Sequence, residues 1–104
     1  MIIAVDFDGT LQFADGKPNQ DLISRLATEQ RRGNTIILWT CREGKRLNEA
    51  LIFLQKNGFR PNFINQNSPQ AIAMLGHDSR KIYADIYIDD KSIRQGCFFH
   101  INGT

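Results

Sequence analysis

The sequence contains few of the residues that build disulfide-stapled or metal-knuckle proteins. It has two cysteines and two histidines in 104 residues, and their spacing does not match a zinc site. Cys41 is followed six residues later by Leu47 rather than by an arginine, which does not fit the loop of a cysteine phosphatase. We therefore expect Cys41 and Cys97 to be reduced thiols, and His77 and His100 to be ordinary surface or boundary histidines.

Long apolar runs and an excess of one charge are also missing. The apolar runs extend over only a few residues, too few to span a bilayer, and the N-terminus lacks the pattern of a signal peptide. Thirteen basic and eleven acidic side chains give a net charge of +2, which does not by itself indicate a nucleic-acid or membrane partner. We expect a cytoplasmic protein with a single domain over residues 1–104.

A short apolar run at the N-terminus ends in two carboxylates. Residues 2–5 show no polar alternation, which is typical of a central parallel strand that is covered on both faces. In an extended chain, side chains two residues apart project the same way, roughly 6 to 7 Å apart, so Asp6 and Asp8 are expected to converge on one cation or reacting group. A surface turn is the alternative for the Asp-Gly pair alone, but the apolar strand before it favours a site.

The rest of the chain alternates between apolar runs and helical periodicity. We expect helices that end before Gly33, over residues 44–57, and over residues 68–75. Apolar runs predict further strands at residues 35–39, 63–65 and 82–88, the last interrupted by Asp85, and an edge strand at residues 96–101. This alternation indicates an α/β fold, a three-layer α/β/α sandwich with a mostly parallel Rossmann-like sheet.

Two further expectations concern the surroundings of the acids. Trp39 lies inside an apolar run, so we expect it in the core, with a stacking platform as the alternative. Residues 11–17 are expected to form a loop that covers the acidic site as a small flap.

Polar clusters follow three of the predicted strands. In an open parallel sheet, ligands bind beyond the carboxyl ends of the strands, so these clusters are expected to meet at one edge. The clusters are Asp6 with Asp8, Thr40 with Cys41 and Arg42, and Asp89 with Asp90.

Such a set of side chains suits magnesium and phosphate. Several carboxylates in one crevice repel one another unless a cation is present, and oxygen ligands without histidine or cysteine favour Mg²⁺ over zinc. The Thr40 hydroxyl and the N-terminus of the following helix suit phosphoryl oxygens, and Lys81 would neutralise another, with the adjacent Arg80 as the alternative. Asp6, anchored at a strand end, is the expected nucleophile, and Asp8, on the turn, the expected acid and base.

These residues also carry a family resemblance. The run Asp6-Phe7-Asp8-Gly9-Thr10-Leu11 resembles the first motif of the haloacid dehalogenase superfamily of aspartate-nucleophile phosphohydrolases. Thr40 is similar to its second motif, Lys81 to its third, and Ile88-Asp89-Asp90 to its fourth. The four motifs occur in order across residues 6–90, and the short segments between them leave no room for the cap domain that many members carry.

The resemblance implies a magnesium-dependent phosphatase or phosphotransferase with an aspartyl-phosphate intermediate on Asp6. It places Asp8 in the acid–base role, which disfavours a dehalogenase. The expected metal ligands are Asp6, the main-chain carbonyl of Asp8, and either Asp90 as the inner ligand with Asp89 outside it, or the reverse. The expected substrate contacts are Gly9, Thr40, Cys41, Arg42 and Lys81.

Two other functions are compatible with parts of the sequence. A receiver-like signalling module also holds magnesium and an aspartyl phosphate, but its phosphorylated Asp would follow the third strand, where this sequence has Asn65-Gln66-Asn67. A catalytically silent module that binds phosphate and magnesium is another alternative. An open site would accept a small metabolite, a phosphorylated macromolecule or a nucleic-acid end, with a homo-oligomer as one source of a lid.

Overall fold

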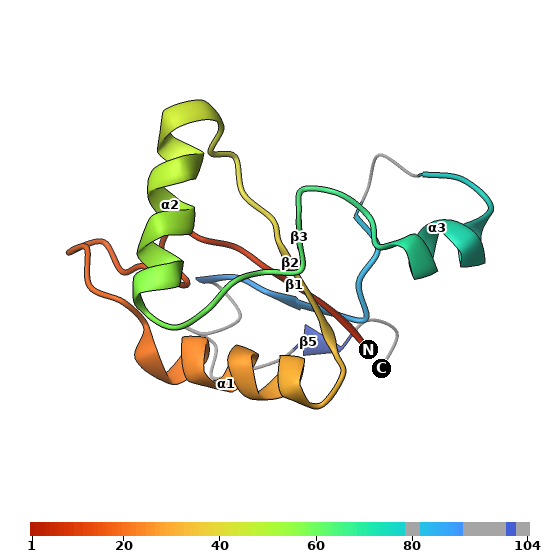
Figure 1. The fold of residues 1–104 in the computed structure, drawn as a ribbon, viewed down its shortest axis with the longest axis horizontal. Coiled ribbons are helices and arrows are strands. Elements are labelled where there is room, and N and C mark those ends of the chain that lie inside the picture. The colour runs from red at the N-terminus through yellow and green to blue at the C-terminus, as the bar shows by residue number, and fades with distance from the viewer. Residues whose placement is uncertain (79–81, 91–99, 102–104) are drawn as a thin grey trace.

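The computed structural model describes residues 1–78, 82–90 and 100–101. Its five strands form one sheet in the order β3-β2-β1-β4-β5 (Figure 1). The first four of these strands run parallel and β5 pairs antiparallel with β4. The elements are β1 (Ile2–Val5), α1 (Gln20–Arg31), β2 (Thr35–Leu38), α2 (Gly44–Lys56), β3 (Phe63–Ile64), α3 (Pro69–Leu75), β4 (Ile86–Ile88) and β5 (His100–Ile101).

The apolar strand β1 is the centre of the sheet. It pairs with β2 on one side and β4 on the other, and all four of its residues are buried. Side chains of Ile3 and Val5 join a core cluster with α1 and α2, whereas Ile2 and Ala4 join a second cluster with α3 on the opposite face. The predicted α/β/α sandwich with a mostly parallel sheet is therefore confirmed.

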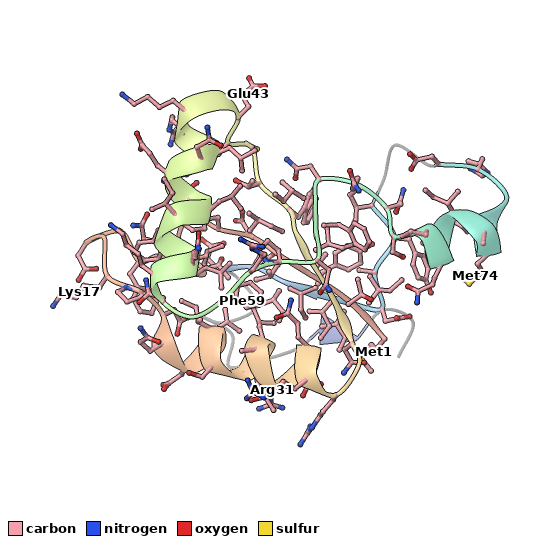
Figure 2. The ribbon with its side chains drawn as sticks, in the orientation of Figure 1. Met1, Lys17, Arg31, Glu43, Phe59 and Met74 are labelled. Carbon is pink, nitrogen blue, oxygen red and sulfur yellow. The ribbon has the colours of Figure 1, made fainter. Side chains whose placement is uncertain are left out.

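Helix ends follow the expected local rules. Asn19 caps α1 by accepting a hydrogen bond from the Leu22 N–H at 3.3 Å, and Ser68 caps α3 by accepting one from the Ala71 N–H at 3.1 Å. Phe59, just after α2, is only 3% exposed and lies in the core, whereas charged side chains such as Arg31 lie at the periphery (Figure 2). In the described part of the chain, no helix has the length and apolar composition that a membrane crossing requires.

The strand predicted at residues 82–88 is shorter than expected. Only Ile86–Ile88 forms β4, because Asp85 is not a strand residue but a partner for the start of β1. Its carboxylate accepts a hydrogen bond from the Ile2 N–H at 2.7 Å and from the Tyr83 hydroxyl at 3.1 Å. The acid that interrupts the apolar pattern therefore satisfies a backbone donor at the end of the sheet.

The expectation that Trp39 is in the core is wrong, because the residue is 46% exposed. The alternation along β2 places Trp39 on the same face as Ile37, where the second cluster lies. Among the described residues, that face is covered by α3 and residues 82–84, and Trp39 lies beyond this cover at the end of the strand. Of the edge strand predicted at residues 96–101, the last two residues form β5, and the others lie outside the described residues.

Candidate active site

A cavity of about 370 Å³ lies at the carboxyl ends of β1, β2 and β4. The three strands run parallel, so the residues that follow them meet at one edge of the sheet. The meeting of the three polar clusters at this edge agrees with the sequence analysis, although not all of their members enter the cavity. The lining residues are Asp6, Trp39, Thr40, Cys41, Asp89 and Asp90.

Two hydrogen bonds with main-chain groups fix Asp6 just after β1. Its N–H donates to the Ile88 carbonyl at 3.0 Å, and its carboxylate Oδ1 accepts a hydrogen bond from the Phe7 N–H at 2.8 Å. Burial raises the pKa of Asp6 above its ordinary value of 3.8, and the charges of Asp8, Asp90 and Asp89 raise it further. A cation beside Asp6 would relieve this repulsion.

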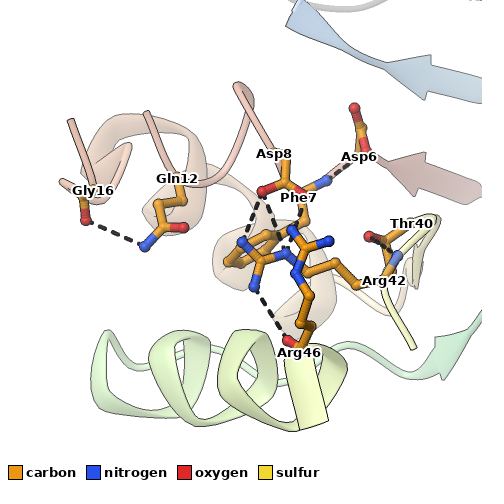
Figure 3. A network of polar contacts seen from close by, with 8 residues as sticks. All are labelled: Asp6, Phe7, Asp8, Gln12, Gly16, Thr40, Arg42 and Arg46. Carbon is orange, nitrogen blue, oxygen red and sulfur yellow. Dashed lines mark hydrogen bonds and ion pairs between the residues drawn. The ribbon is translucent and has the colours of Figure 1, made fainter. Parts of the chain in front are cut away.

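Asp8 does not join Asp6 in the cavity. Its carboxylate forms a bidentate ion pair with the Arg42 guanidinium, with Nη2 at 2.8 Å from Oδ1 and Nε at 3.0 Å from Oδ2 (Figure 3). The Arg42 hydrogen bonds lower the pKa of Asp8 below its usual 3.8. Arg42 itself lies over the Phe7 ring, 4.7 Å from its centroid, and also donates to the Arg46 carbonyl at 3.1 Å.

Two expectations about residues 6–17 are wrong: the common direction of Asp6 and Asp8, and the flap. The prediction that Asp6 and Asp8 point the same way assumed an extended chain, but the turn begins at Phe7, whose carbonyl accepts hydrogen bonds from the Thr10 and Leu11 N–H groups at 3.1 and 2.9 Å. Arg42 pairs with Asp8 in this structure, and its contact with the substrate stays a prediction. The loop at residues 11–17 does not line the cavity, so it is not a flap over it.

Thr40 is positioned by Asn65, which was not among the predicted site residues. Asn65 follows β3, and its amide bridges the Thr40 backbone, accepting from the N–H and donating to the carbonyl at 2.8 Å each. The Thr40 hydroxyl accepts a hydrogen bond from the Arg42 N–H at 3.1 Å, so its own proton is the group that it offers to a phosphoryl oxygen. The polar run after the third strand was the available signal, because that strand ends at the same edge of the sheet.

The role of Asn65 can be tested against a matched residue at the other end of β2. The Asn62 amide oxygen accepts a hydrogen bond from the Ile36 N–H at 2.8 Å, far from the cavity. We expect Asn65→Gly and Asn62→Gly each to lower the free energy of unfolding by about 1 kcal/mol in urea denaturation. Glycine suits position 65 because Asn65 has a φ of 52°, and the same substitution at position 62 keeps the two variants matched.

Turnover should separate the two variants. Asn65→Gly is expected to lower kcat/KM for a phosphate ester by roughly 10- to 100-fold, because Thr40 loses its support. Asn62→Gly should stay within about twofold of the wild type. Equal losses of kcat/KM in both variants would show that Asn65 acts through stability alone.

The oxygen ligands in the cavity fit Mg²⁺. Among the described residues, no three acidic, histidine or cysteine side chains form a ready-made metal cluster. The expected set needs only two carboxylates with the Asp8 main-chain carbonyl, and Mg²⁺ is usually held by one or two carboxylates and water. Among the described residues that line the cavity there is no histidine, and apart from the Cys41 thiol the side-chain donors are hard oxygens.

Gly9 distinguishes the two acids of the fourth motif. It has a φ of +78°, and a Cβ placed on it would lie 3.7 Å from Asp90 Cβ and 3.8 Å from Asp90 Oδ2. Asp90 therefore lies against the Asp8–Gly9 main chain, whose carbonyl is an expected metal ligand. This contact favours Asp90 over Asp89 as the inner ligand.

The remaining predicted site residues are placed as follows. Cys41 is exposed and lines the cavity, whereas the first turn of α2 does not. Lys81 and its alternative Arg80 lie outside the described residues.

Two other cavities have fewer side chains that could act on a substrate. One of about 290 Å³ has Asp85 as the single acid among its described lining residues, and the Asp85 carboxylate already accepts two hydrogen bonds. Another of about 300 Å³ is lined by apolar side chains, Gln55 and Arg60, without an acid. The cavity at Asp6 is therefore the strongest candidate for an active site.

One solved structure is similar to this chain along almost its whole length. It is that of a conserved protein from Bacteroides thetaiotaomicron, with 29% sequence identity and a TM-score of 0.70, and the match covers 92% of this chain and 91% of the other. No family model and no curated protein matches the chain. The likeness supports the fold and carries no activity with it.

Proposed function

We propose that the chain is a magnesium-dependent phosphohydrolase that hydrolyses phosphomonoesters through an aspartyl phosphate on Asp6, as a capless member of the haloacid dehalogenase superfamily. The observation that carries this proposal is the cavity that brings together Asp6, Thr40 and Asp90 from the ends of three parallel strands. A nucleophile, a hydroxyl donor and a cation ligand are the parts that phosphoryl transfer requires.

In the proposed reaction, Asp6 attacks phosphorus. The Phe7 N–H holds Oδ1, which orients the carboxylate and leaves Oδ2 to form the new oxygen–phosphorus bond while the bond to the leaving oxygen breaks. Thr40 donates its hydroxyl proton to a phosphoryl oxygen. Bound Mg²⁺, held by Asp6, Asp90 and the Asp8 carbonyl, would offset the negative charge of the carboxylates and the phosphate.

Asp8 is the group that completes the cycle. The leaving oxygen takes a proton from Asp8, and Asp8 later removes a proton from the water that hydrolyses the aspartyl phosphate. While Asp8 is paired with Arg42, its pKa is lowered, so at neutral pH the carboxylate is predominantly ionised, and it points away from the cavity. The first proton transfer therefore requires that substrate binding loosens the Asp8–Arg42 pair.

The same ion pair favours a second candidate, a module that binds phosphate and magnesium without turnover. If Arg42 holds Asp8 permanently, the cavity retains its ligands for phosphate and cation but lacks an acid. A receiver-like module has less support, because Asn65, at the end of β3, is committed to the Thr40 backbone.

Hydrolysis of a generic aryl phosphate tests the proposal. We expect turnover with Mg²⁺ and its loss, by at least about 10³-fold, when the metal is chelated, because the carboxylates then repel the phosphate. Beryllium fluoride, measured by calorimetry, should bind only when Mg²⁺ is present. Metal-dependent binding of beryllium fluoride without any turnover would favour the silent module, and the absence of both would reject the site.

Several attributes belong to the same proposal. The substrate is a phosphorylated small molecule or macromolecule, the location is cytoplasmic, and a homo-oligomer is one means of covering an open site.

A further inference from the structure

Trp39 forms one wall of the cavity that contains Asp6. It directly precedes Thr40, and its N–H donates to the Val5 carbonyl at 2.8 Å, which fixes its backbone to the last residue of β1, just before Asp6. The residue is 46% exposed although a large aromatic side chain gains most by burial. Leaving this indole exposed beside the acids therefore forgoes the stabilisation that its burial would give.

The orientation of the indole is fixed by packing. It meets the Tyr87 ring edge to face, with centroids 5.9 Å apart and an interplanar angle of 62°. Tyr87 is itself fixed, since its hydroxyl donates to the Ile82 carbonyl at 2.6 Å and accepts from the Ala84 N–H at 3.1 Å. A rigid aromatic surface loses little conformational entropy when it binds a ligand.

We propose that Trp39 stacks against a planar ring in the substrate, so that the phosphomonoester is that of a nucleoside. This inference rests on the proposed function, because it places the phosphate at Asp6 and Thr40. The cavity then has two parts. At one, the carboxylates would bind the phosphate through the metal and the Thr40 hydroxyl donates to it directly; at the other, the indole stacks on the base.

The size and openness of the site agree with this ligand. Small-molecule sites usually measure about 300–1,000 Å³, and 370 Å³ is at the lower end, which suits a ligand the size of a mononucleotide. Stacking accepts any base because every base has a π-face, so the site would select the nucleoside class rather than one base. The Trp39 side chain is about half exposed among the described residues. The terminal base of a nucleic-acid strand would therefore reach the indole as readily as the base of a free nucleotide.

Fluorescence tests the contact without relying on turnover. Trp39 is the single tryptophan of the chain, so its emission reports on this wall alone. In the Asp6→Asn variant with Mg²⁺, a nucleoside 5′-monophosphate should quench the emission, and ribose 5-phosphate, which has the same sugar and phosphate without a base, should not. Quenching that is equal for both ligands would overturn the proposal.

Hydrolysis supplies the second readout. Trp39→Leu should lower kcat/KM for the nucleoside monophosphate by roughly 5- to 150-fold and that for ribose 5-phosphate by less than about twofold. Trp39→Phe keeps a ring and should recover part of the loss. Phe13→Leu, which removes a ring that is 43% exposed and outside the cavity, should change neither value.

The outcomes separate this inference from the proposed function. Equal losses for both substrates in Trp39→Leu would reject stacking and leave the phosphatase assignment intact. Base-dependent quenching without hydrolysis of any phosphate ester would reject the phosphatase assignment and support the stacking wall. A 5′-phosphorylated oligonucleotide, compared with the mononucleotide, decides between a nucleic-acid end and a free nucleotide as the source of the ring.

Discussion

Asp6→Asn is expected to lower kcat for phosphate-ester hydrolysis by roughly 10⁴- to 10⁶-fold while the fold is retained. An amide does not attack phosphorus, so the covalent intermediate cannot form. The asparagine keeps an oxygen that accepts the Phe7 N–H, the bond that is 2.8 Å long in the wild type. Steady-state kinetics with Mg²⁺ and an aryl phosphate measures the loss.

A matched control is Asp15→Asn. Asp15 also accepts a backbone hydrogen bond, from the Lys17 N–H at 3.0 Å, but it is exposed and lies outside the cavity. Its substitution should leave kcat within about twofold of the wild type. Wild-type turnover in Asp6→Asn would remove Asp6 from the role of nucleophile.

The stability of Asp6→Asn should move in the opposite direction to its activity. Because burial and neighbouring charges raise the pKa of Asp6, its ionised form is disfavoured in the folded state at neutral pH. In the presence of a chelator at pH 7, Asp6→Asn should therefore unfold at a higher urea concentration than the wild type. The difference should fade as the pH falls through the raised pKa and below 3.8, where Asp6 is protonated in both folded and unfolded chains.

Arg42→Gln should move the basic limb of the pH–rate profile to higher pH. Arg42 lowers the pKa of Asp8, so the protonated acid that the leaving oxygen needs becomes scarce as the pH rises above that low value. Without the guanidinium, the pKa of Asp8 returns toward 3.8 and the protonated fraction at a given pH increases. At pH 6 to 7, kcat/KM for an alkyl phosphate should then rise by several-fold to about tenfold.

The leaving group provides the internal control for this prediction. An aryl oxide departs without a proton, so kcat/KM for an aryl phosphate should change much less. Arg46→Gln is the matched variant, since Arg46 lowers the pKa of Asp8 by charge alone, without a side-chain hydrogen bond, and its loss should give a smaller shift of the same sign. Because the pH dependence of kcat/KM reports the free enzyme, an unchanged basic limb in Arg42→Gln would show that the Asp8–Arg42 pair does not set the protonation of the acid.

The Asp8–Arg42 pair should contribute little to stability. The Asp8 side chain is 54% exposed and the Arg42 side chain 14%, and exposed ion pairs are worth about 0.2–1 kcal/mol in double-mutant cycles, so this bidentate pair should lie at the upper end of that range. Its presence is better explained by what it does to Asp8 than by what it adds to the free energy of unfolding.

Local pattern predicted the scaffold of the site well. The uninterrupted apolar runs of β1 and β2 identify strands buried on both faces, and Gly33 and Gly58 mark the helix ends within a residue or two. The geometry of parallel sheets then brings Asp6, Thr40 and Asp90 to one edge. These features follow from the chain alone, because they depend on residue spacing and on the common direction of the strands.

The direction of individual side chains was decided by tertiary structure. Asp8 points to Arg42, 34 residues later in the chain, because the turn at Phe7 ends the two-residue alternation. Asn65 supports Thr40 from another strand, and Trp39 is exposed because the cover of its face ends before it among the described residues. The sequence alone determined the strands and the edge of the sheet where they end. Contacts between distant segments decided which carboxylate faces the cavity and which ring stays exposed. Such contacts leave no local pattern in the sequence.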